Sequence, residues 1–357
     1  MTTLQKFQAA LAETDADAAL ISSELHQRYL SDFDYTDGYL LITPTLAYLL
    51  TDFRYIEAAE AQVKNFTILR PAGTMIEEIE RLISKHVLRR IAIEDASLSY
   101  ADFTRFSKAL SQATLCPGAS RILEGLRIIK TPEELEKIAR AQEIADQAFD
   151  HILGFLSPER TEQEVALELE FFMRKLGAEN VSFQTIAVSG PASSLPHGVP
   201  APVRLRPGFL TMDYGALYQG YCSDMTRTVV IGKADEDMKK LYNTVLDAQL
   251  AALETLEEGK VCRDVDEVAR SIIRNAGYGD CFGHGLGHGV GMRIHEAPRL
   301  SPAAPKESVL KRGHVVTVEP GIYLAGKYGC RIEDMVAIDH DGSIRNFARS
   351  PKNLIEI

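Results

Sequence analysis

One run of the sequence reads Cys281-Phe-Gly-His-Gly-Leu-Gly-His-Gly-Val-Gly-Met-Arg-Ile-His-Glu296 and contains three histidines among alternating glycines. Each glycine costs conformational entropy on folding, so this run favours neither a regular helix nor a regular strand. It permits a close approach of the backbone to a bound group, with imidazoles as the reactive side chains. The alternative interpretation is a flexible loop, and partners for the histidines elsewhere in the chain decide between the two.

Two upstream segments supply carboxylates that can face each other. Residues 209–215 and 221–230 are rich in β-forming side chains and flank a turn at Tyr218-Gln219. If they fold as a hairpin about this turn, Asp213 lies opposite Asp224 on the same face, with Cβ atoms about 5 Å apart. Like charges placed so are destabilising unless one is protonated or a cation lies between them.

The same arrangement recurs downstream. Residues 314–323 and 329–338 predict a second hairpin that turns about Gly326, which sets Glu319 opposite Glu333. An uncompensated buried carboxylate costs on the order of several kcal/mol, so two such pairs among Val, Ile, Met and Tyr indicate a cation site. Two independent exposed pairs are the alternative. Four carboxylates with one neutral imidazole form an oxygen-rich site, which favours Mn(II), Fe(II), Co(II) or Mg(II) over a structural zinc.

Length and composition limit the classes of protein. A chain of 357 residues favours two domains, and its apolar (45%) and charged (25%) fractions are those of a soluble globular protein. The net charge of -11 argues against nucleic acid or an anionic membrane as the main partner. We find neither a signal peptide nor an apolar run long enough to span a bilayer. Five cysteines without CxxC spacing exclude a four-cysteine zinc site and favour a reducing cytoplasm.

The chain is expected to divide near residues 122–130. The first part alternates helical and strand patterns, with a helix at 4–11, a strand at 18–21, a hairpin at 38–51, a helix at 76–83 and a strand at 90–94. At Thr131 a capping box with proline at N1 starts a helix to about Phe155, and a second capped helix runs from Thr161 to Lys175. We therefore predict a small N-terminal α/β domain of residues 1–123 and a larger domain of residues 124–357.

Six segments together make the chain resemble the proline-specific metallopeptidases of the pita-bread fold, aminopeptidase P and prolidase. They are Leu195-Pro-His-Gly198, Asp213-Tyr-Gly215, Ser223-Asp-Met-Thr-Arg-Thr228, Gly287-His-Gly-Val-Gly-Met-Arg-Ile-His-Glu296, Val318-Glu-Pro-Gly-Ile-Tyr323 and Arg331-Ile-Glu-Asp334. They follow the family's order and spacing. The resemblance implies an α+β fold: a pita-bread (creatinase/aminopeptidase) catalytic domain preceded by a smaller creatinase N-like α/β domain.

The resemblance also implies a dinuclear metal site. Asp213 would chelate one ion, Asp224 and Glu333 would bridge both, and His288 with Glu319 would complete the other. Of the divalent ions, Mn(II) is the first expectation, with Co(II), Fe(II) and Zn(II) as alternatives.

The implied catalytic groups lie around these ligands. Glu319 would move a proton to the leaving nitrogen, and His197 and His295 would hold the substrate and stabilise the tetrahedral oxyanion. Tyr323 and Arg331 resemble supporting groups of the same site.

The resemblance predicts a cytoplasmic, homodimeric exopeptidase that hydrolyses the Xaa-Pro bond at the N-terminus of peptides. Its partner would be a peptide with proline at the second position, with no role for nucleic acid or membrane. One alternative is an Xaa-Pro dipeptidase (prolidase), which a contact between Arg299 and a substrate carboxylate would favour. A more remote alternative is a non-catalytic pita-bread binding protein, which the complete ligand set disfavours.

Other site types fit the sequence less well. His295-Glu296 resembles the start of HExxH, but Arg299 stands where the second histidine must be. The glycines have no G-x-G-x-x-G register, which argues against a dinucleotide site. Ser189 and Ser193 lie in no G-x-S-x-G elbow, which argues against a serine hydrolase. His284 is left without a role.

Overall fold

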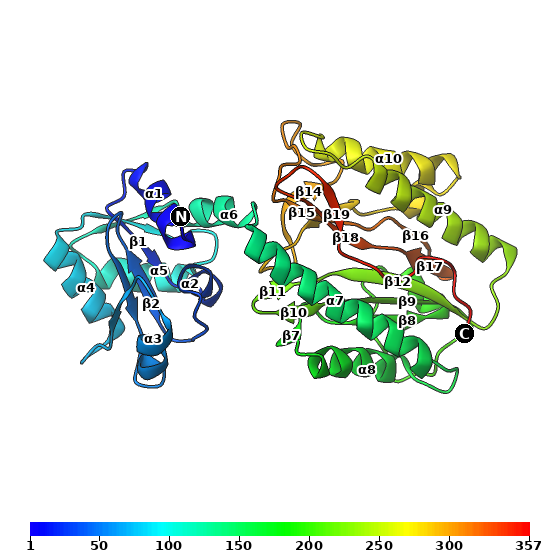
Figure 1. Ribbon diagram of the computed structural model, residues 1–357, viewed down its shortest axis with the longest axis horizontal. Coiled ribbons are helices and arrows are strands. Elements are labelled where there is room, and N and C mark those ends of the chain that lie inside the picture. Colours follow the sequence, from blue (N-terminus) through cyan, green and yellow to red (C-terminus); the bar gives the residue numbers. More distant parts are fainter. The chain divides into compact units, whose positions relative to one another are not determined.

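The computed structural model describes all 357 residues, which form two compact units, Met1–Arg127 and Ile128–Ile357 (Figure 1). The expected boundary between residues 123 and 124 falls inside helix α6 (Ala119–Arg127). Leu123 is fully buried in the core of the first unit, so the whole of α6 belongs to that unit. The second unit begins with the short segment before helix α7 (Pro132–Phe155).

The first unit is a six-stranded sheet with helices on both faces. Its strand order is β4-β3-β2-β1-β5-β6, and β2 runs antiparallel to both of its neighbours while the other pairs are parallel. Side chains of a strand alternate between the two faces. Ala19 and Ile21 of β1 therefore pack with α1, α2 and α6, whereas Ala18 and Leu20 pack with α4 and α5.

The elements expected in the first 94 residues all occur at their predicted places. The strands are β1 (Ala18–Ile21), β2 (Tyr39–Ile42), β3 (Ala47–Leu50), β4 (Thr67–Leu69), β5 (Arg90–Ile93) and β6 (Thr114–Pro117). The helices before α6 are α1 (Thr3–Ala12), α2 (Glu24–Ser31), α3 (Ile56–Gln62), α4 (Met75–His86) and α5 (Tyr100–Ala109).

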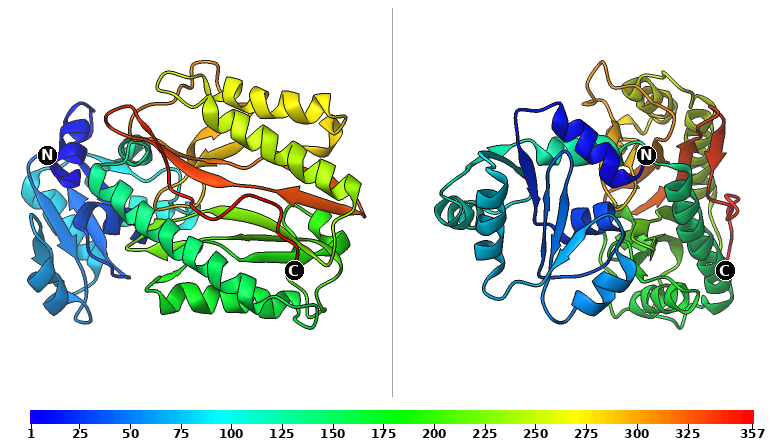
Figure 2. Two further views of the ribbon diagram at one scale, coloured as in Figure 1. Left: turned by 45° about the vertical axis from the view of Figure 1, so that its right-hand side comes forward. Right: turned by 60° about the vertical axis from the view of Figure 1, so that its left-hand side comes forward.

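The second unit contains two helix pairs that cover different strands (Figure 2). α7 and α8 (Glu162–Lys175) pack on β8, β9 and β12, and α9 (Glu236–Glu254) and α10 (Cys262–Asn275) pack on β15 to β18. The strands form a five-stranded sheet β14-β13-β15-β18-β19, two three-stranded sheets, β12-β9-β8 and β11-β10-β7, and a two-stranded sheet β16-β17. This mixture of helices and mostly antiparallel strands is the α+β class that the sequence predicts.

The bounds of the strands in the second unit are as follows. They are β7 (Asn180–Val181), β8 (Ile186–Ser189), β9 (Gly208–Tyr214), β10 (Ala216–Tyr218), β11 (Tyr221–Cys222), β12 (Met225–Ile231), β13 (Gly287–Gly289), β14 (Glu296–Leu300), β15 (Val315–Val318), β16 (Gly321–Leu324), β17 (Tyr328–Arg331), β18 (Asp334–Ile338) and β19 (Ile344–Asn346). Two short 3₁₀ turns, Gly190–Ser194 and Gly279–Cys281, complete the unit.

Both predicted capping boxes are present. The hydroxyl of Thr131 accepts a hydrogen bond from the backbone N–H of Glu134, whose side chain accepts one from the Thr131 N–H, and Pro132 occupies the first turn. Thr161 and Glu164 form the same pair at the start of α8. Each box satisfies two backbone donors that a helix N-terminus leaves without partners.

The two carboxylate hairpins differ in how well the sequence predicts their register. The second is as expected: Val318 pairs with Asp334 and Gly321 with Arg331, so Glu319 and Glu333 face each other between the two ladders. In the first, Asp213 pairs with Thr226 rather than with Asp224.

The predicted partner of Asp213 is wrong by two residues because the turn is predicted one position too early. Gln219 and Gly220 both have positive φ (47° and 80°), so the two-residue turn lies one position later than the predicted Tyr218-Gln219. A slip of two residues leaves every side chain on its face. Asp213 and Asp224 consequently still project from the same side of the hairpin.

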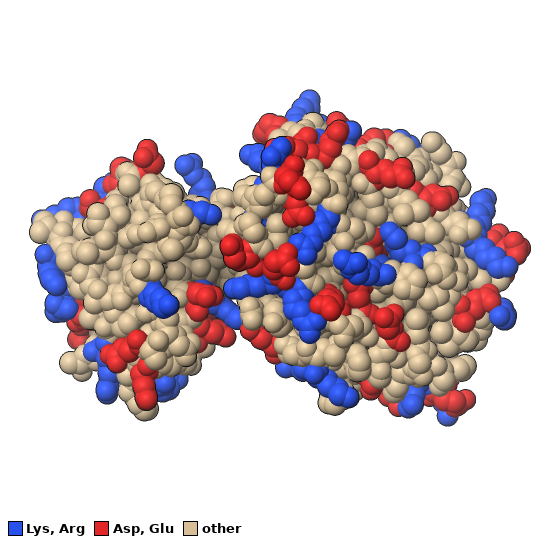
Figure 3. All heavy atoms as spheres, in the orientation of Figure 1, with Lys and Arg blue, Asp and Glu red and all other residues tan.

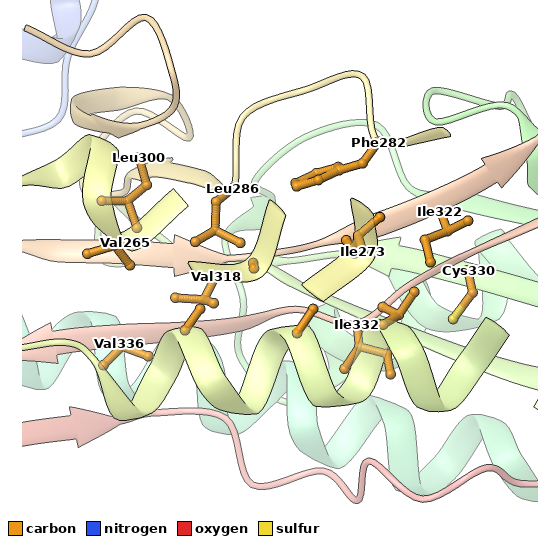
Figure 4. Packing of buried hydrophobic residues seen from close by; sticks show 14 of the residues in the cluster. Val265, Ile273, Phe282, Leu286, Leu300, Val318, Ile322, Cys330, Ile332 and Val336 are labelled. Carbon is orange, nitrogen blue, oxygen red and sulfur yellow. The ribbon is translucent and has the colours of Figure 1, made fainter. Parts of the chain in front are cut away.

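The glycine-histidine run is held firmly and is not a flexible loop. Phe282, Leu286 and Val290, spaced four residues apart in it, are all buried. Figure 4 shows Phe282 and Leu286 packed in one cluster with Val265 and Ile273 of α10. These apolar side chains anchor the run, and His284 and His288 lie between them.

Charged side chains of both signs are interspersed over the face of the molecule shown in Figure 3. A broad basic area of the kind that binds a nucleic-acid backbone is not visible on this face. None of the helices combines the length and the apolar character that crossing a membrane requires.

Candidate metal centre and active site

A cavity of about 740 Å³ lies within the second unit and brings together all the predicted site residues. They are His197, Asp213, Asp224, His288, His295, Glu319 and Glu333. The residues come from the loop between β8 and β9, from β9, from the position before β12, from the glycine-histidine run, and from the two positions that separate β15 from β16 and β17 from β18. Segments more than 100 residues apart in the chain thus converge on one cavity.

Three side chains at the bottom of this cavity are close enough to share a metal ion. Ligand atoms of Asp224, His288 and Glu333 lie within 4.8 Å of one another, and all three residues are buried. The carboxylate of Glu319 joins them, with Oε1 3.3 Å from His288 Nε2. Asp213 lies on the cavity wall beside them, and its Oδ1 is buried without a hydrogen-bond partner.

The glycines on either side of His288 are required by close packing. A Cβ atom at Gly287 would lie 2.0 Å from the backbone oxygen of Thr317, and one at Gly289 would lie 2.1 Å from that of Ala297. Strand β13 therefore fits between β14 and β15 only without side chains at these two positions. The result is that the imidazole of His288 faces the carboxylates.

Hydrogen bonding and burial fix the state of the His288 ring. Its Nδ1 lies 3.0 Å from the carbonyl oxygen of Gly289, to which it donates, so Nε2 carries the lone pair. Burial lowers the pKa of His288 to about 3, which keeps the ring neutral at physiological pH. Nε2 is directed at Asp224, 3.5 Å from Oδ2, as well as at Glu319. A neutral imidazole in this tautomer has the free lone pair that a metal ligand needs.

The carboxylates lie so close together in a buried site that ionising all of them is electrostatically unfavourable. Burial, followed by the charges of neighbouring carboxylates, raises the pKa of Asp224 and Glu333 well above their usual values. Burial raises the pKa of Glu319 to about 7. A divalent cation would replace the protons that these groups otherwise retain. The set of carboxylate oxygens and one imidazole nitrogen therefore fits a hard or borderline divalent ion.

Two threonine hydroxyls orient the carboxylates, and sequence reasoning missed both. Thr226 donates to Glu333 Oε2 (2.6 Å), and Thr317 donates to Glu319 Oε1 (3.0 Å). Strand periodicity could have identified Thr317, because it lies two positions before Glu319 and therefore on the same face of the strand. Partners of this kind fix the ligand geometry around a metal.

A chain of hydrogen bonds gives His284 its place beside the site. Arg331 donates to Asp213 Oδ2 and to the hydroxyl of Tyr323 (2.6 Å). His284 Nδ1 donates to the carbonyl oxygen of Gly285 (2.8 Å), so its Nε2 accepts from the Tyr323 hydroxyl (3.0 Å). Burial, with Arg331 second, lowers the pKa of His284 to about 4, which keeps the ring neutral as this chain requires.

The remaining predicted residues lie where a substrate can reach them. His197 and His295 are exposed residues on the cavity wall, and Arg299 lies beside them. The His295 ring packs edge-on against His288, with ring centroids 4.4 Å apart and an interplanar angle of 80°. Burial and the charge of Arg299 lower the pKa of His295, which favours its neutral, hydrogen-bonding form.

Comparison with known proteins agrees with this geometry. Residues 136–340 match the metallopeptidase family M24, and residues 3–129 match the creatinase/prolidase N-terminal domain. The Xaa-Pro dipeptidase of Pyrococcus furiosus is 38% identical over 96% of this chain and 96% of its own. Among solved structures, an Xaa-Pro dipeptidase from Bacillus anthracis has a TM-score of 0.94 and 40% identity over 99% of both chains.

A solved X-Pro aminopeptidase from Thermotoga maritima is also similar, with a TM-score of 0.92 and 34% identity over 99% of this chain and 100% of its own. The likeness covers both units, so the second unit has the pita-bread fold and the first is the domain that precedes it. The chain therefore belongs to the metallopeptidase family M24, in the branch that carries a creatinase/prolidase N-terminal domain.

Proposed function

We propose that this protein is a dinuclear metal-dependent Xaa-Pro dipeptidase. The observation that carries the proposal is the buried group of Asp224, His288 and Glu333 at the bottom of a cavity that also contains the cationic side chain of Arg299. The sequence alone predicts an Xaa-Pro aminopeptidase-like activity, with the dipeptidase as its alternative, and leaves the preferred peptide length open. The relatives named as dipeptidases support the dipeptide interpretation instead.

The metal ligands in this proposal are five side chains. Asp213, Asp224, His288, Glu319 and Glu333 would together hold two divalent ions, with Asp224 and Glu333 shared between them. The bound ions would polarise the scissile carbonyl and lower the pKa of water. Because the ligands are mostly oxygen, Mn(II) is the expected ion, with Co(II), Fe(II) and Zn(II) as alternatives.

The chain's own groups bind the peptide and move its protons. Glu319, oriented by Thr317, carries a proton to the proline nitrogen as that atom leaves. His295 and His197 donate hydrogen bonds to the carbonyl oxygen as negative charge develops on it. The lowered pKa of His295 suits this role, because the neutral ring can donate one N–H without competing with the cations for the carboxylates.

Arg299 supports the preference for dipeptides. Its guanidinium lies close enough to lower the pKa of His295, so it lies within electrostatic range of the bound peptide. In a dipeptide the proline residue ends in a carboxylate, which can pair with this cation. In a tripeptide the same position is a neutral amide, and the free carboxylate lies one residue further away.

The test compares Ala-Pro with Ala-Pro-Ala in the Mn(II)-loaded protein. We expect Ala-Pro to have the higher kcat/KM. Arg299→Gln should lower kcat/KM for Ala-Pro by roughly 10–100-fold, because charged hydrogen bonds are worth about 1.5–3 kcal/mol, while leaving Ala-Pro-NH2 nearly unchanged. Faster cleavage of Ala-Pro-Ala would instead identify an aminopeptidase. Absence of cleavage with any of the four metals would favour the non-catalytic alternative.

Two further parts of the sequence-based interpretation stay predictions. A homodimer is checked by light scattering coupled to size-exclusion chromatography. The cytoplasmic location is checked by fractionation of cells that express the protein at its natural level.

A further inference from the structure

A buried lysine lies behind the turn that carries His295. The Lys130 side chain is 1% exposed. Its backbone N–H donates to the carbonyl oxygen of Gly313 (2.8 Å), and its own carbonyl oxygen accepts from His340 Nε2 (2.8 Å). A Cβ atom at Gly313 would lie 2.9 Å from the Lys130 oxygen, so the two segments are in close contact. The lysine backbone is thus fixed independently of its ammonium group.

The ammonium group of Lys130 meets the carboxylate of Glu296. Nζ lies 3.3 Å from Glu296 Oε2, and the glutamate side chain is only 7% exposed. Burial of either charge is unfavourable, but each compensates the other. Neither residue belongs to the proposed metal ligands, so the ion pair has no part in the chemistry described above.

Glu296 also closes the turn of residues 291–296, which is called the His295 turn below. Its Oε1 accepts a hydrogen bond from the backbone N–H of Arg293 (2.9 Å). A Cβ atom at Gly291 would lie 2.6 Å from Oε2, so the carboxylate occupies the space where a side chain would stand. The carboxylate therefore fills the inside of the turn and braces it.

His295 comes directly before Glu296, and its position depends on this turn. The turn is joined to the rest of the unit by the Cys222 N–H, which donates to the carbonyl oxygen of Gly291 (2.8 Å). Within the turn, the Gly291 N–H donates to the carbonyl oxygen of Arg293 (3.1 Å). On its other side the His295 ring rests edge-on against His288. Displacement of Glu296 would move the adjacent His295 relative to the metal ligands.

We propose that Lys130 is a positioning residue for His295 and acts through the carboxylate of Glu296. With the ammonium removed, the buried carboxylate of Glu296 would lose the cation that lies 3.3 Å from its Oε2, the cost of keeping its charge buried would rise, and the side chain would turn toward water. The Arg293 N–H would then lose its acceptor and the His295 turn would loosen. The kinetic consequence rests on the proposed function, in which His295 contacts the peptide, whereas the structural consequence does not.

Hydrogen–deuterium exchange tests the structural consequence. In Lys130→Met we expect exchange of a peptide covering residues 291–296 to rise by roughly tenfold or more, with no change in a peptide from α10. Lys130→Arg should restore protection, because it retains the charge. The double variant Lys130→Met/Glu296→Gln should be better protected than Lys130→Met, because the neutral amide at position 296 does not need the cation that Lys130 supplied. The matched control is Lys239→Met, which removes an exposed ion pair with Glu236.

Kinetics on Ala-Pro with Mn(II) test the functional consequence. Because small displacements of a positioning group can cost about 10²-fold, we expect kcat to fall by roughly 10–100-fold in Lys130→Met, with a smaller change in KM and unchanged metal content. The double variant should recover part of this loss.

Two outcomes would overturn the proposal. One is wild-type exchange of the His295 turn in Lys130→Met. The other is an equal rise in exchange in both peptides, which would mean that Lys130 only stabilises the unit as a whole. A wild-type protein that cleaves no Xaa-Pro dipeptide would refute the proposed function, while the exchange measurements would still decide the role of Lys130.

Discussion

Burial sets the protonation states of several side chains in the active site. The pKa is lowered to about 3 for the buried imidazole of His288 and to about 4 for the half-buried imidazole of His284, while the pKa of Glu319 rises to about 7. All three shifts have the same first cause, which is removal of the charged form from water. These states suit a metal centre. The imidazoles are neutral, and the carboxyl groups can give up a proton when a cation binds.

At the residue scale, we predict that Glu319→Gln loses roughly 10²–10⁴-fold in kcat on Ala-Pro. The amide keeps an acceptor for the Thr317 hydroxyl but carries no charge and transfers no proton. Steady-state kinetics on Ala-Pro, with the metal content of the variant measured in parallel, check this prediction. Glu307→Gln, which changes an exposed glutamate, is the control. Full activity of Glu319→Gln would refute the role that we assign to this residue.

A second residue-scale prediction concerns acid stability. Burial, with the charges of Lys130 and Lys311, lowers the pKa of His314 to about 4, below its value of about 6.5 in the unfolded chain. The unfolded chain therefore binds the additional proton between these two pH values. The resulting contribution to stability is complete above pH 6.5 and is lost as the pH falls toward 4, by up to about 3 kcal/mol.

His314→Asn should remove most of this pH dependence, because the amide oxygen can accept from the Lys311 N–H as His314 Nδ1 does, without titrating. Urea unfolding between pH 4 and 7 measures the difference. An acid dependence as steep as that of the wild type would contradict the assignment.

At the scale of elements, the active site depends on how closely β13, β14 and β15 pack. The alternating glycines are not a sign of flexibility, since Gly287 and Gly289 each face a neighbouring backbone oxygen. The paired carboxylates come from two hairpins, one with a two-residue turn at Gln219-Gly220 and one about Gly326. Strand periodicity then places all four carboxylates toward one cavity.

We therefore predict that Gly287→Ala destabilises the protein by on the order of 3 kcal/mol and weakens metal binding. The added methyl group would lie 2.0 Å from the Thr317 backbone oxygen and would displace His288. Thermal unfolding and metal titration check both effects.

The matched control is Gly154→Ala in helix α7, where the added methyl group meets nothing within 4 Å. Alanine should be neutral there, or stabilising by up to about 1 kcal/mol. Equal stability of the two variants would show that the close packing around His288 is unimportant.

At the scale of the whole molecule, a single cavity in the second unit collects carboxylates whose mutual repulsion opposes folding. The pKa of Asp224 and Glu333 lies well above the usual range, and that of Glu319 is about 7. A group whose pKa is raised by folding contributes stability at low pH, and this contribution is lost as the pH rises through the folded-state value. Bound cations remove this penalty.

Chelation with EDTA should accordingly lower the melting temperature, and it should do so more at pH 8 than at pH 6. A metal ion present at 100 times its dissociation constant stabilises the folded state by about 2.7 kcal/mol. Its removal should therefore lower the melting temperature by about 5–10 °C for a unit of this size. Calorimetry with and without EDTA at the two pH values measures the effect, and readdition of Mn(II) is the control. A melting temperature insensitive to EDTA would argue against metal-linked folding.

The sequence by itself determined the family, the residues that meet in the cavity and part of the secondary structure. Periodicity and capping boxes located helices such as α7 and α8 because these signals are local, whereas α9 and α10 were not predicted. The second hairpin's register followed from the turn about Gly326.

Only the tertiary structure decided features that depend on contacts between distant segments. The first hairpin's partner for Asp213 depended on two positive φ angles at Gln219 and Gly220. The link from Lys130 to Glu296 joins residues 166 positions apart, and no periodicity connects them. The same is true of the support that Thr226 gives to Glu333. Local patterns specify which face a side chain takes, whereas the packing of the whole unit decides which side chain it meets there.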